Sequence, residues 1–317
     1  MSIIDFVRSR LRESQLWVKL RAFQRVGVKL TFDRWRLGRK VLKTKPIRTV
    51  SLDYQYRHDC EVHILIWDQD VAMGLWAAKS FYTASQCRWP LIWHQGGALS
   101  GSSVKALKYH FPDSSIVLEE EILPVIEAKL NILKHFNTIE ARKRSFMLRK
   151  LIDCVILARS DYLLLMDTDV LFFQMPHFLI DAVREGQLDA AFNRDENSHY
   201  NITPEECEKQ FGFKLKACIN AGLGLIRVDA WHLEKINLYL GNKKINESPW
   251  LVEQTLQAML ASQSEFSFFP ETYLNSSSGG MTSVSGEPCV AKHYASHPRP
   301  FFFREGIPKV IPLLESL

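Results

Sequence analysis

Residues 161–173 read Asp-Tyr-Leu-Leu-Leu-Met-Asp-Thr-Asp-Val-Leu-Phe-Phe. The apolar run from Tyr162 to Met166 is typical of a strand buried on both faces of a mostly parallel sheet. Two carboxylates, Asp167 and Asp169, follow it. An unpaired carboxylate is costly to bury, so we expect both acids at the carboxyl edge of the sheet, where open α/β sheets bind ligands. Two acids two positions apart can both reach one hard divalent cation, which predicts a metal–diphosphate site.

Two other interpretations of this Asp-x-Asp stay open. The acids could simply open a surface turn after a core strand. Phosphatases of the haloacid dehalogenase type also place Asp-x-Asp after an apolar strand, and Asp167 would then be the phosphoryl-accepting nucleophile. In that fold the motif usually opens the domain, whereas 166 residues precede it here, and no convincing second acidic pair follows a later strand.

The composition is that of an ordinary globular protein, with 317 residues, 46% hydrophobic and 24% charged. No window approaches 18 consecutive apolar residues, so no transmembrane helix is predicted, and the N-terminus lacks the apolar core of a signal peptide. The six cysteines are scattered without a Cys-x-x-Cys pair, which favours reduced thiols. We therefore expect a cytoplasmic protein.

The net charge of +5 hides an asymmetry along the chain. Residues 1–50 hold 14 Lys and Arg against 3 Asp and Glu, whereas the remainder holds 26 against 32. Within this basic region, apolar and basic residues alternate in a roughly amphipathic helical pattern. Such helices lie on anionic membrane surfaces, so residues 1–50 predict an extension with peripheral contact to the inner face of a membrane. A helix packed on the catalytic domain is the alternative, and no nucleic-acid-binding motif is present.

Downstream of residue 60, apolar strands alternate with helical patterns, which predicts a right-handed parallel α/β sheet flanked by helices. Strands are expected at residues 61–68, 90–94, 114–118, 162–166, 188–192 and 223–228. Helices are expected at residues 71–85, 100–109, 120–136 and 138–158. We expect one catalytic domain at 51–317, with a nucleotide-binding half at about 60–190 and an acceptor-binding half at about 190–306.

Several further motifs occur in an order that resembles a known family. They are Trp67-Asp-Gln-Asp70 with Ala77-Ala-Lys-Ser80, Arg149-Lys-Leu151, Met166-Asp-Thr-Asp-Val170, Asn220-Ala-Gly-Leu-Gly224, Glu253-Gln254 and His293-Tyr294. Over roughly residues 60–306 the chain resembles metal-dependent glycosyltransferases of the GT-A fold, most closely family-8-like bacterial enzymes. The resemblance implies transfer of a sugar from a nucleotide donor.

The resemblance also implies a set of metal ligands. In such enzymes the two Asp-x-Asp carboxylates hold Mn²⁺ or Mg²⁺ against the donor diphosphate, and a C-terminal histidine completes the protein ligands. By resemblance these are Asp167, Asp169 and His293, with His297 as a competitor for the third position. Imidazole beside carboxylates suits Mn²⁺ better than Ca²⁺.

Other donor contacts follow from the same resemblance. Asp68 would read the nucleoside base or ribose, although a turn also favours aspartate there. Lys150, 17 positions before Asp167, corresponds to a basic donor-binding residue. Asn220 and Gly222 would line the sugar pocket. The tail residues Lys292, Arg299 and Arg304 could close over the diphosphate.

Glu253 and Gln254 correspond to the pair that the family places beside the anomeric carbon, usually as Asp-Gln. If the enzyme inverts the sugar, Glu253 is the natural general base for the acceptor hydroxyl. If it retains, the pair positions the acceptor and stabilises the oxocarbenium-like centre.

We therefore expect a hexosyltransferase that acts on a saccharide or lipid-linked acceptor, in cell-envelope or polysaccharide biosynthesis. The phosphatase and a non-catalytic nucleotide-sugar or glycan binder are the alternatives.

Overall fold

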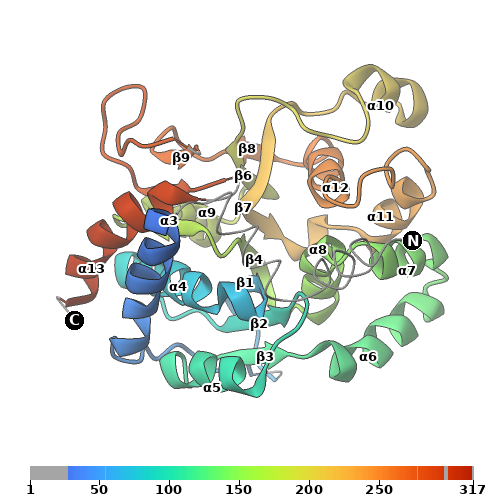
Figure 1. The fold of residues 1–317 in the computed structure, drawn as a ribbon. Coiled ribbons are helices and arrows are strands. Elements are labelled where there is room, and N and C mark those ends of the chain that lie inside the picture. Colours follow the sequence, from blue (N-terminus) through green and yellow to red (C-terminus); the bar gives the residue numbers. More distant parts are fainter. Residues whose placement is uncertain (1–27, 54, 277, 296–298, 316–317) are drawn as a thin grey trace, which may run out of the picture.

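A computed structural model describes residues 28–53, 55–276, 278–295 and 299–315. A seven-stranded sheet with the order β3-β2-β1-β4-β7-β6-β8 runs through its centre (Figure 1). The strands are β1 (His58–Ile66), β2 (Leu91–Gln95), β3 (Ser115–Val117), β4 (Ser160–Met166), β6 (Ala190–Arg194), β7 (Ile219–Arg227) and β8 (Phe266–Phe268). Neighbouring strands are parallel, except that β7 is antiparallel to both β4 and β6. The prediction of a mostly parallel α/β sheet is confirmed.

A second, three-stranded sheet continues directly from β4. It contains β5 (Val170–Phe172), β9 (Tyr273–Asn275) and β10 (Ala291–His293), with β10 in the middle. Because β10 is antiparallel to β5, His293 lies opposite Val170 and one residue away from Asp169. Pairing of two short strands therefore brings the C-terminal histidine to the Asp-x-Asp.

Helices cover both faces of the large sheet. The side chains of β4 point alternately to the two faces and pack into two separate apolar clusters. Tyr162, Leu164 and Met166 enter one cluster, and Leu163 and Leu165 enter the other. The first cluster takes side chains from α4 (Val71–Ser85), α5 (Gly101–His110), α9 (His177–Glu185) and α13 (Ile307–Glu315). The second takes them from α6 (Glu119–Ile132), α7 (Phe136–Arg144), α8 (Met147–Leu157), α10 (Pro204–Phe211), α11 (Leu233–Leu240) and α12 (Val252–Ala261). β4 is thus buried on both faces, as its sequence predicts.

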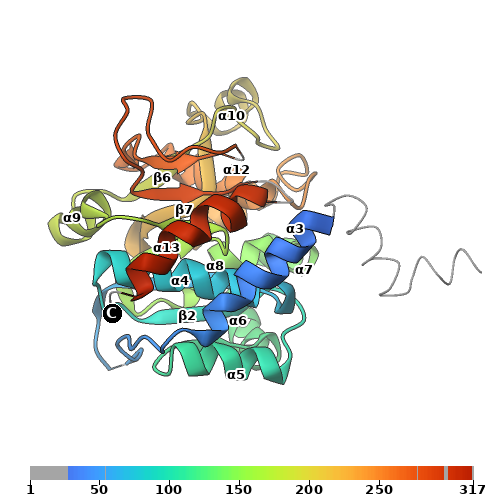
Figure 2. The same cartoon turned by 60° about the vertical axis from the view of Figure 1, so that its left-hand side comes forward.

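The first described segment is helical and packs against the domain. It consists of α3 (Val28–Asp33), η1 (Arg34–Gly38) and η2 (Arg39–Lys43), and it lies beside α13 in both views (Figures 1 and 2). Three of its side chains, Leu30, Leu37 and Val41, belong to the first apolar cluster. Residues 1–27 of the predicted basic extension lie outside the described residues.

Two differences from the predicted elements have local causes. The expected helix at 138–158 is two helices, α7 and α8, because Ser145 adopts an extended backbone and its hydroxyl donates to Pro249 O at 2.7 Å. The strands β5, β9 and β10 have three residues each, too few to give a periodic signal. No described helix has both the length and the apolar character needed to cross a bilayer.

The large sheet takes strands from both sides of residue 190, so the two predicted halves share it. The division into functional halves at residue 190 and the boundary at residue 50 stay predictions.

A network of ion pairs centred on the buried Arg142 joins helices α6, α7 and α8. Removing Arg142 tests how much this network contributes to stability. Arg142 donates to Asp153 at 2.6 and 2.7 Å and to both carboxylate oxygens of Glu119 at 3.0 Å. Breaking a buried pair leaves a charge uncompensated, so Arg142→Ala should lower the free energy of unfolding by about 3 to 5 kcal/mol in urea denaturation. Arg144→Ala, on the same helix but 73% exposed, should cost about 0.5 kcal/mol or less. Equal losses for the two variants would contradict this expectation.

Candidate metal and diphosphate site

The Asp-x-Asp lies where the two sheets meet. β4 ends at Met166, and the backbone N–H of Asp167 donates to Gly222 O on β7 at 2.8 Å. The carbonyl of Asp169 accepts from the Tyr294 N–H at 3.0 Å, just after β10. Backbone hydrogen bonds on both sides therefore fix the acids at the carboxyl end of the central strand.

Three predicted metal ligands come together at this point. One ligand atom each of Asp167, Asp169 and His293 lies within 4.8 Å of the others. His293 Nε2 is 3.3 Å from Asp169 Oδ1 and 4.0 Å from Asp167 Oδ2. Two donors that bind one ion at about 2.0–2.2 Å lie about 3 to 4.4 Å apart, so these separations fit a single divalent cation. The predicted competitor, His297, lies outside the described residues.

Each of these three side chains is held at the atom that faces away from the others. Lys150 Nζ donates to Asp167 Oδ1 at 2.8 Å, and the guanidinium of Arg299 pairs with Asp169 Oδ2. Asn220 Oδ1 lies 2.8 Å from His293 Nδ1. The two other carboxylate oxygens and Nε2 are left facing one another. We call Asp167, Asp169 and His293 the acid–histidine triad.

The contact with Asn220 fixes the tautomer of the histidine. Asn220 Oδ1 also accepts from the Gly222 N–H at 2.9 Å, which marks it as the acceptor for His293 Nδ1–H. In the neutral ring the lone pair then lies on Nε2, toward the carboxylates, as metal ligation requires. Burial opposes charge on this ring, but Asp169 and then Asp167 raise the pKa of His293 overall.

The carboxylate of Asp169 is the more strongly compensated of the two acids. It is buried, which by itself raises the pKa of Asp169, but His293 and then Arg299 lower it overall. Arg299 reaches it from a backbone φ of 58°, a left-handed conformation that residues other than glycine rarely adopt. Asp169 is therefore ionised at neutral pH.

Glycine is required at position 222 for a steric reason. A Cβ there would lie 2.2 to 2.6 Å from three atoms of the His293 ring, well inside contact distance. The glycine thus makes room for the imidazole, and the predicted close approach of Gly222 to a sugar stays a prediction.

An outer set of acidic residues surrounds the groups that hold the triad. Glu253 Oε1 lies 3.3 Å from Lys150 Nζ, and Asp195 Oδ2 accepts from Asn220 Nδ2 at 3.2 Å. Asp70, in η3 (Asp68–Asp70), interacts electrostatically with Arg299. Basic or amide groups thus lie between two layers of acids.

The predicted catalytic pair, Glu253 and Gln254, is largely shielded from solvent. Glu253 is buried, and burial raises its pKa to about 7 even though Lys150 opposes the shift. Gln254 is half-buried, accepts from the Ala221 N–H at 3.2 Å and donates to His199 O at 3.1 Å. In this arrangement Glu253 contacts Lys150, and Gln254 holds the backbone next to Asn220.

Asp68 is exposed just after β1, and the structure does not bring it into contact with the triad. Its Oδ1 accepts from the Ser100 N–H at 2.7 Å, and hydrogen bonds from Ser103 and Ser100 lower its pKa. It lies at the same carboxyl edge of the sheet as Asp167, since β1 and β4 are parallel neighbours.

The three basic residues of the predicted tail have different surroundings. Lys292 is buried and donates to Ser278 O and Gly280 O at 2.8 Å, and Arg304 pairs with Asp33 at 2.7 Å. Of the three, Arg299 is the one that pairs with the triad. Sequence reasoning assigned no site role to Asp70, although it quoted this residue within Trp67-Asp-Gln-Asp70, and it missed Asp195, which belongs to no recognised motif.

A second cluster, His63, His94 and Cys154, also groups metal-binding atoms, but its distances favour hydrogen bonding. His63 Nδ1 lies 2.7 Å from His94 Nε2, and Cys154 Sγ is 3.5 Å from the same nitrogen. Two nitrogens on one tetrahedral Zn²⁺ lie about 3.3 Å apart. Glu61 lies 3.2 Å from His63 Nε2, so these residues form a buried polar chain through the core.

Comparisons of sequence find no matching family model and no matching curated protein. Among solved structures, an active-site mutant of LgtC aligns with a TM-score of 0.50 at 13% identity, over 81% of this chain and 96% of that chain. The bifunctional glycosyltransferase WbbM aligns with a TM-score of 0.50 at 13% identity, over 84% of this chain and 53% of that chain. Mouse xyloside xylosyltransferase 1 aligns with a TM-score of 0.49 at 11% identity, over 78% of this chain and 98% of that chain. Membership of family 8 stays a prediction. The chain has the GT-A fold of nucleotide-sugar glycosyltransferases.

Proposed function

We propose that this protein is a metal-dependent glycosyltransferase that moves a hexose from a nucleotide-diphosphate sugar to an acceptor hydroxyl. The observation that carries the proposal is the acid–histidine triad at the end of β4, whose three inward atoms fit one divalent ion. The GT-A fold supports it, because LgtC and WbbM, which share that fold, are glycosyltransferases.

In the proposed reaction the triad holds the ion, and the donor diphosphate binds on its open side next to the partly exposed Asp167. When bound, Mn²⁺ or Mg²⁺ would offset the negative charge that builds on the departing nucleoside diphosphate. Lys150 is 1% exposed, which favours a role in fixing the Asp167 carboxylate over direct contact with the donor. Asp68, at the exposed edge, is proposed to read the base or ribose.

The oxygen and nitrogen donors of the triad favour Mn²⁺ or Mg²⁺ over a softer ion. Asn220 supports a ligand role for His293, because it orients the imidazole in the same way as the outer hydrogen bonds of known metal-bound histidines. Asn220 Oδ1 is shared by two donors and Nδ2 donates to Asp195, so the proposed role of Asn220 is to hold His293. The amide nitrogen carries a second hydrogen, and the predicted contact of Asn220 with sugar hydroxyls stays a prediction.

We propose a saccharide or lipid-linked saccharide as acceptor, and a place in polysaccharide or cell-envelope synthesis at the inner face of a membrane. The basic sequence of residues 1–50 supports the lipid-linked form. Of the rivals, the phosphatase expects the motif to open its domain, whereas Asp167 here follows the fourth strand. A non-catalytic nucleotide-sugar binder would share the fold, and it differs from a transferase in that it does not turn the donor over.

The decisive assay measures release of nucleoside diphosphate from a panel of nucleotide sugars, with and without Mn²⁺. We expect turnover of at least one donor and loss of that turnover with a chelator. Turnover should fall at least 100-fold in Asp169→Ala, because the bound cation would no longer offset the negative charge on the departing nucleoside diphosphate. Metal-dependent donor binding without turnover would favour the binder. If no donor is bound or turned over with any divalent ion, the proposal fails.

Gly222→Ala tests the steric support of the histidine. The added methyl group must displace the His293 ring, so we expect Mn²⁺ affinity, measured by titration calorimetry, to fall at least tenfold while the fold is kept. Gly101→Ala is the matched control, because a Cβ at that position meets nothing within 4 Å. Unchanged Mn²⁺ affinity in Gly222→Ala would remove His293 from the ligand set.

Glu253→Gln separates a positioning role from general-base catalysis. Since Glu253 is buried beside Lys150, we expect kcat to fall by about tenfold or less, with the larger effect on the KM for the donor. Loss of a general base typically costs about 100- to 10,000-fold. Steady-state kinetics over a range of pH would show which loss occurs, and a fall in kcat of the larger size would restore the base assignment.

A further inference from the structure

The outward side of the N-terminal helical segment exposes large apolar side chains. Phe32 is 54% exposed and Trp35 is 59% exposed, and their ring centroids are 5.9 Å apart. The guanidinium of Arg36 lies 6.0 Å from the Phe32 ring centroid. Two neighbouring exposed aromatic rings with a cation above one of them are unusual on a surface that faces only water.

Basic residues gather around these rings. Arg36, Arg39, Lys40 and Lys43, together with Trp35 and Leu42, line a hollow of about 450 Å³. None of these four cations forms an ion pair within the part of the chain that the structure describes. Residues 34–48 contain seven Lys and Arg and no Asp or Glu. The segment therefore carries positive charge and no acidic residue of its own.

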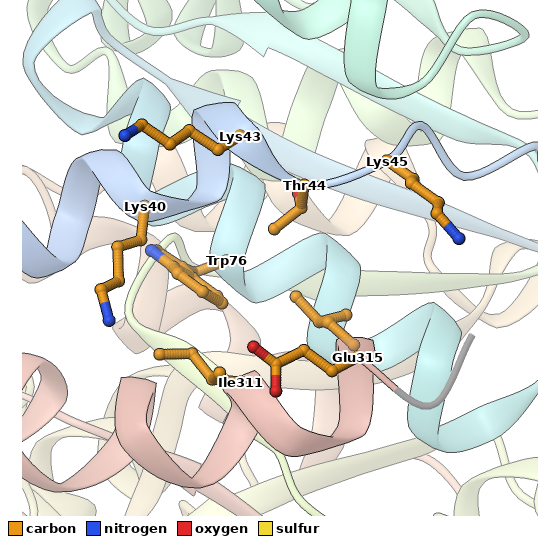
Figure 3. A pocket seen from close by; sticks show the side chains of 8 residues that line it. Lys40, Lys43, Thr44, Lys45, Trp76, Ile311 and Glu315 are labelled. Atoms are coloured by element: carbon orange, nitrogen blue, oxygen red, sulfur yellow. The ribbon is translucent and has the colours of Figure 1, made fainter.

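A second hollow, of about 480 Å³, lies on the other side of Lys40 and Lys43. In Figure 3, the Trp76 ring lies between Lys40 of η2 and Ile311 of α13, and Glu315 supplies an acid from the facing wall. The buried Lys79 donates to the backbone carbonyl of Lys45, a residue that lines this hollow, and burial lowers the pKa of Lys79 to about 8.

The same segment also acts electrostatically on residues of the candidate site. Arg34, adjacent to Trp35, interacts electrostatically with Asp70 and Arg299, and Arg299 pairs with Asp169. Its neighbour Asp33 pairs with Arg304. The segment that carries the outward rings is therefore coupled electrostatically to the outer residues of the metal and diphosphate site.

We propose that the face formed by Phe32, Trp35, Arg36, Arg39, Lys40 and Lys43 docks on an anionic lipid bilayer. Aromatic rings favour the headgroup level of a bilayer, and each basic residue near an anionic surface adds about 1 kcal/mol. Both kinds of side chain are present on this face, and the basic, amphipathic sequence continues upstream through residues 1–27. The inference extends the proposed function, since a lipid-linked acceptor would meet the site at this surface.

Vesicle co-sedimentation of the full chain tests the docking. We expect binding to vesicles that contain phosphatidylglycerol and not to phosphatidylcholine alone, and a decrease with salt because exposed charges are screened. Lys40→Gln/Lys43→Gln should weaken binding roughly 30-fold, at about 1 kcal/mol for each residue. Trp35→Ser should weaken binding even at low salt, because it removes the ring that enters the headgroup layer.

The matched control is Lys209→Gln/Lys214→Gln, which removes the same charge from two exposed lysines at and after α10. Equal weakening in both pairs, equal binding to the two kinds of vesicle, or self-association without vesicle binding would overturn the proposal. Mn²⁺-dependent nucleotide binding, measured on the same proteins, should not change. If the wild-type protein binds vesicles but shows no Mn²⁺-dependent nucleotide binding, only the proposed function is overturned.

Discussion

The arrangement of the whole site depends on one electrostatic constraint: two carboxylates at the end of a strand buried on both faces must be compensated. Lys150 and Arg299 hold the outward oxygens of Asp167 and Asp169, and His293 faces the inward ones. These three groups come from α8, from the segment before α13 and from β10, so the fold brings together positions far apart in sequence. Because Lys150 and Arg299 bind the outward carboxylate oxygens, the inward oxygens and His293 Nε2 are left to bind a ligand.

The supporting residues alternate in charge with distance from the centre. Glu253 and Asp195 contact Lys150 and Asn220, and Asp70 acts on Arg299. Such an arrangement holds the side chains of the triad in single orientations before a ligand binds, which lowers the cost of ordering them. It also explains why a buried lysine is tolerated, since Lys150 has acidic partners on two sides.

The fold and the centre of the site were accessible from sequence because they rest on local patterns. The apolar run before Asp167 predicted a central strand, and strand–helix alternation predicted the sheet. His293 came from family resemblance, since a lone histidine has no local signal. The burial of Glu253 and the inward turn of Asn220 could not be predicted, because both depend on Lys150 and His293 approaching from other elements. The three-residue strands that deliver His293 were too short to detect.

The packing of the first helical segment limits how this protein can be shortened. Leu30, Leu37 and Val41 contribute to the same apolar cluster as α4 and α13, and the Trp76 indole N–H donates to Gly38 O at 2.9 Å. Cutting the chain at residue 50 would open a cavity over α4 and leave a buried indole donor unsatisfied. A truncated protein that lost membrane affinity would therefore also be a damaged one, and only point changes on the outward side can separate the two effects.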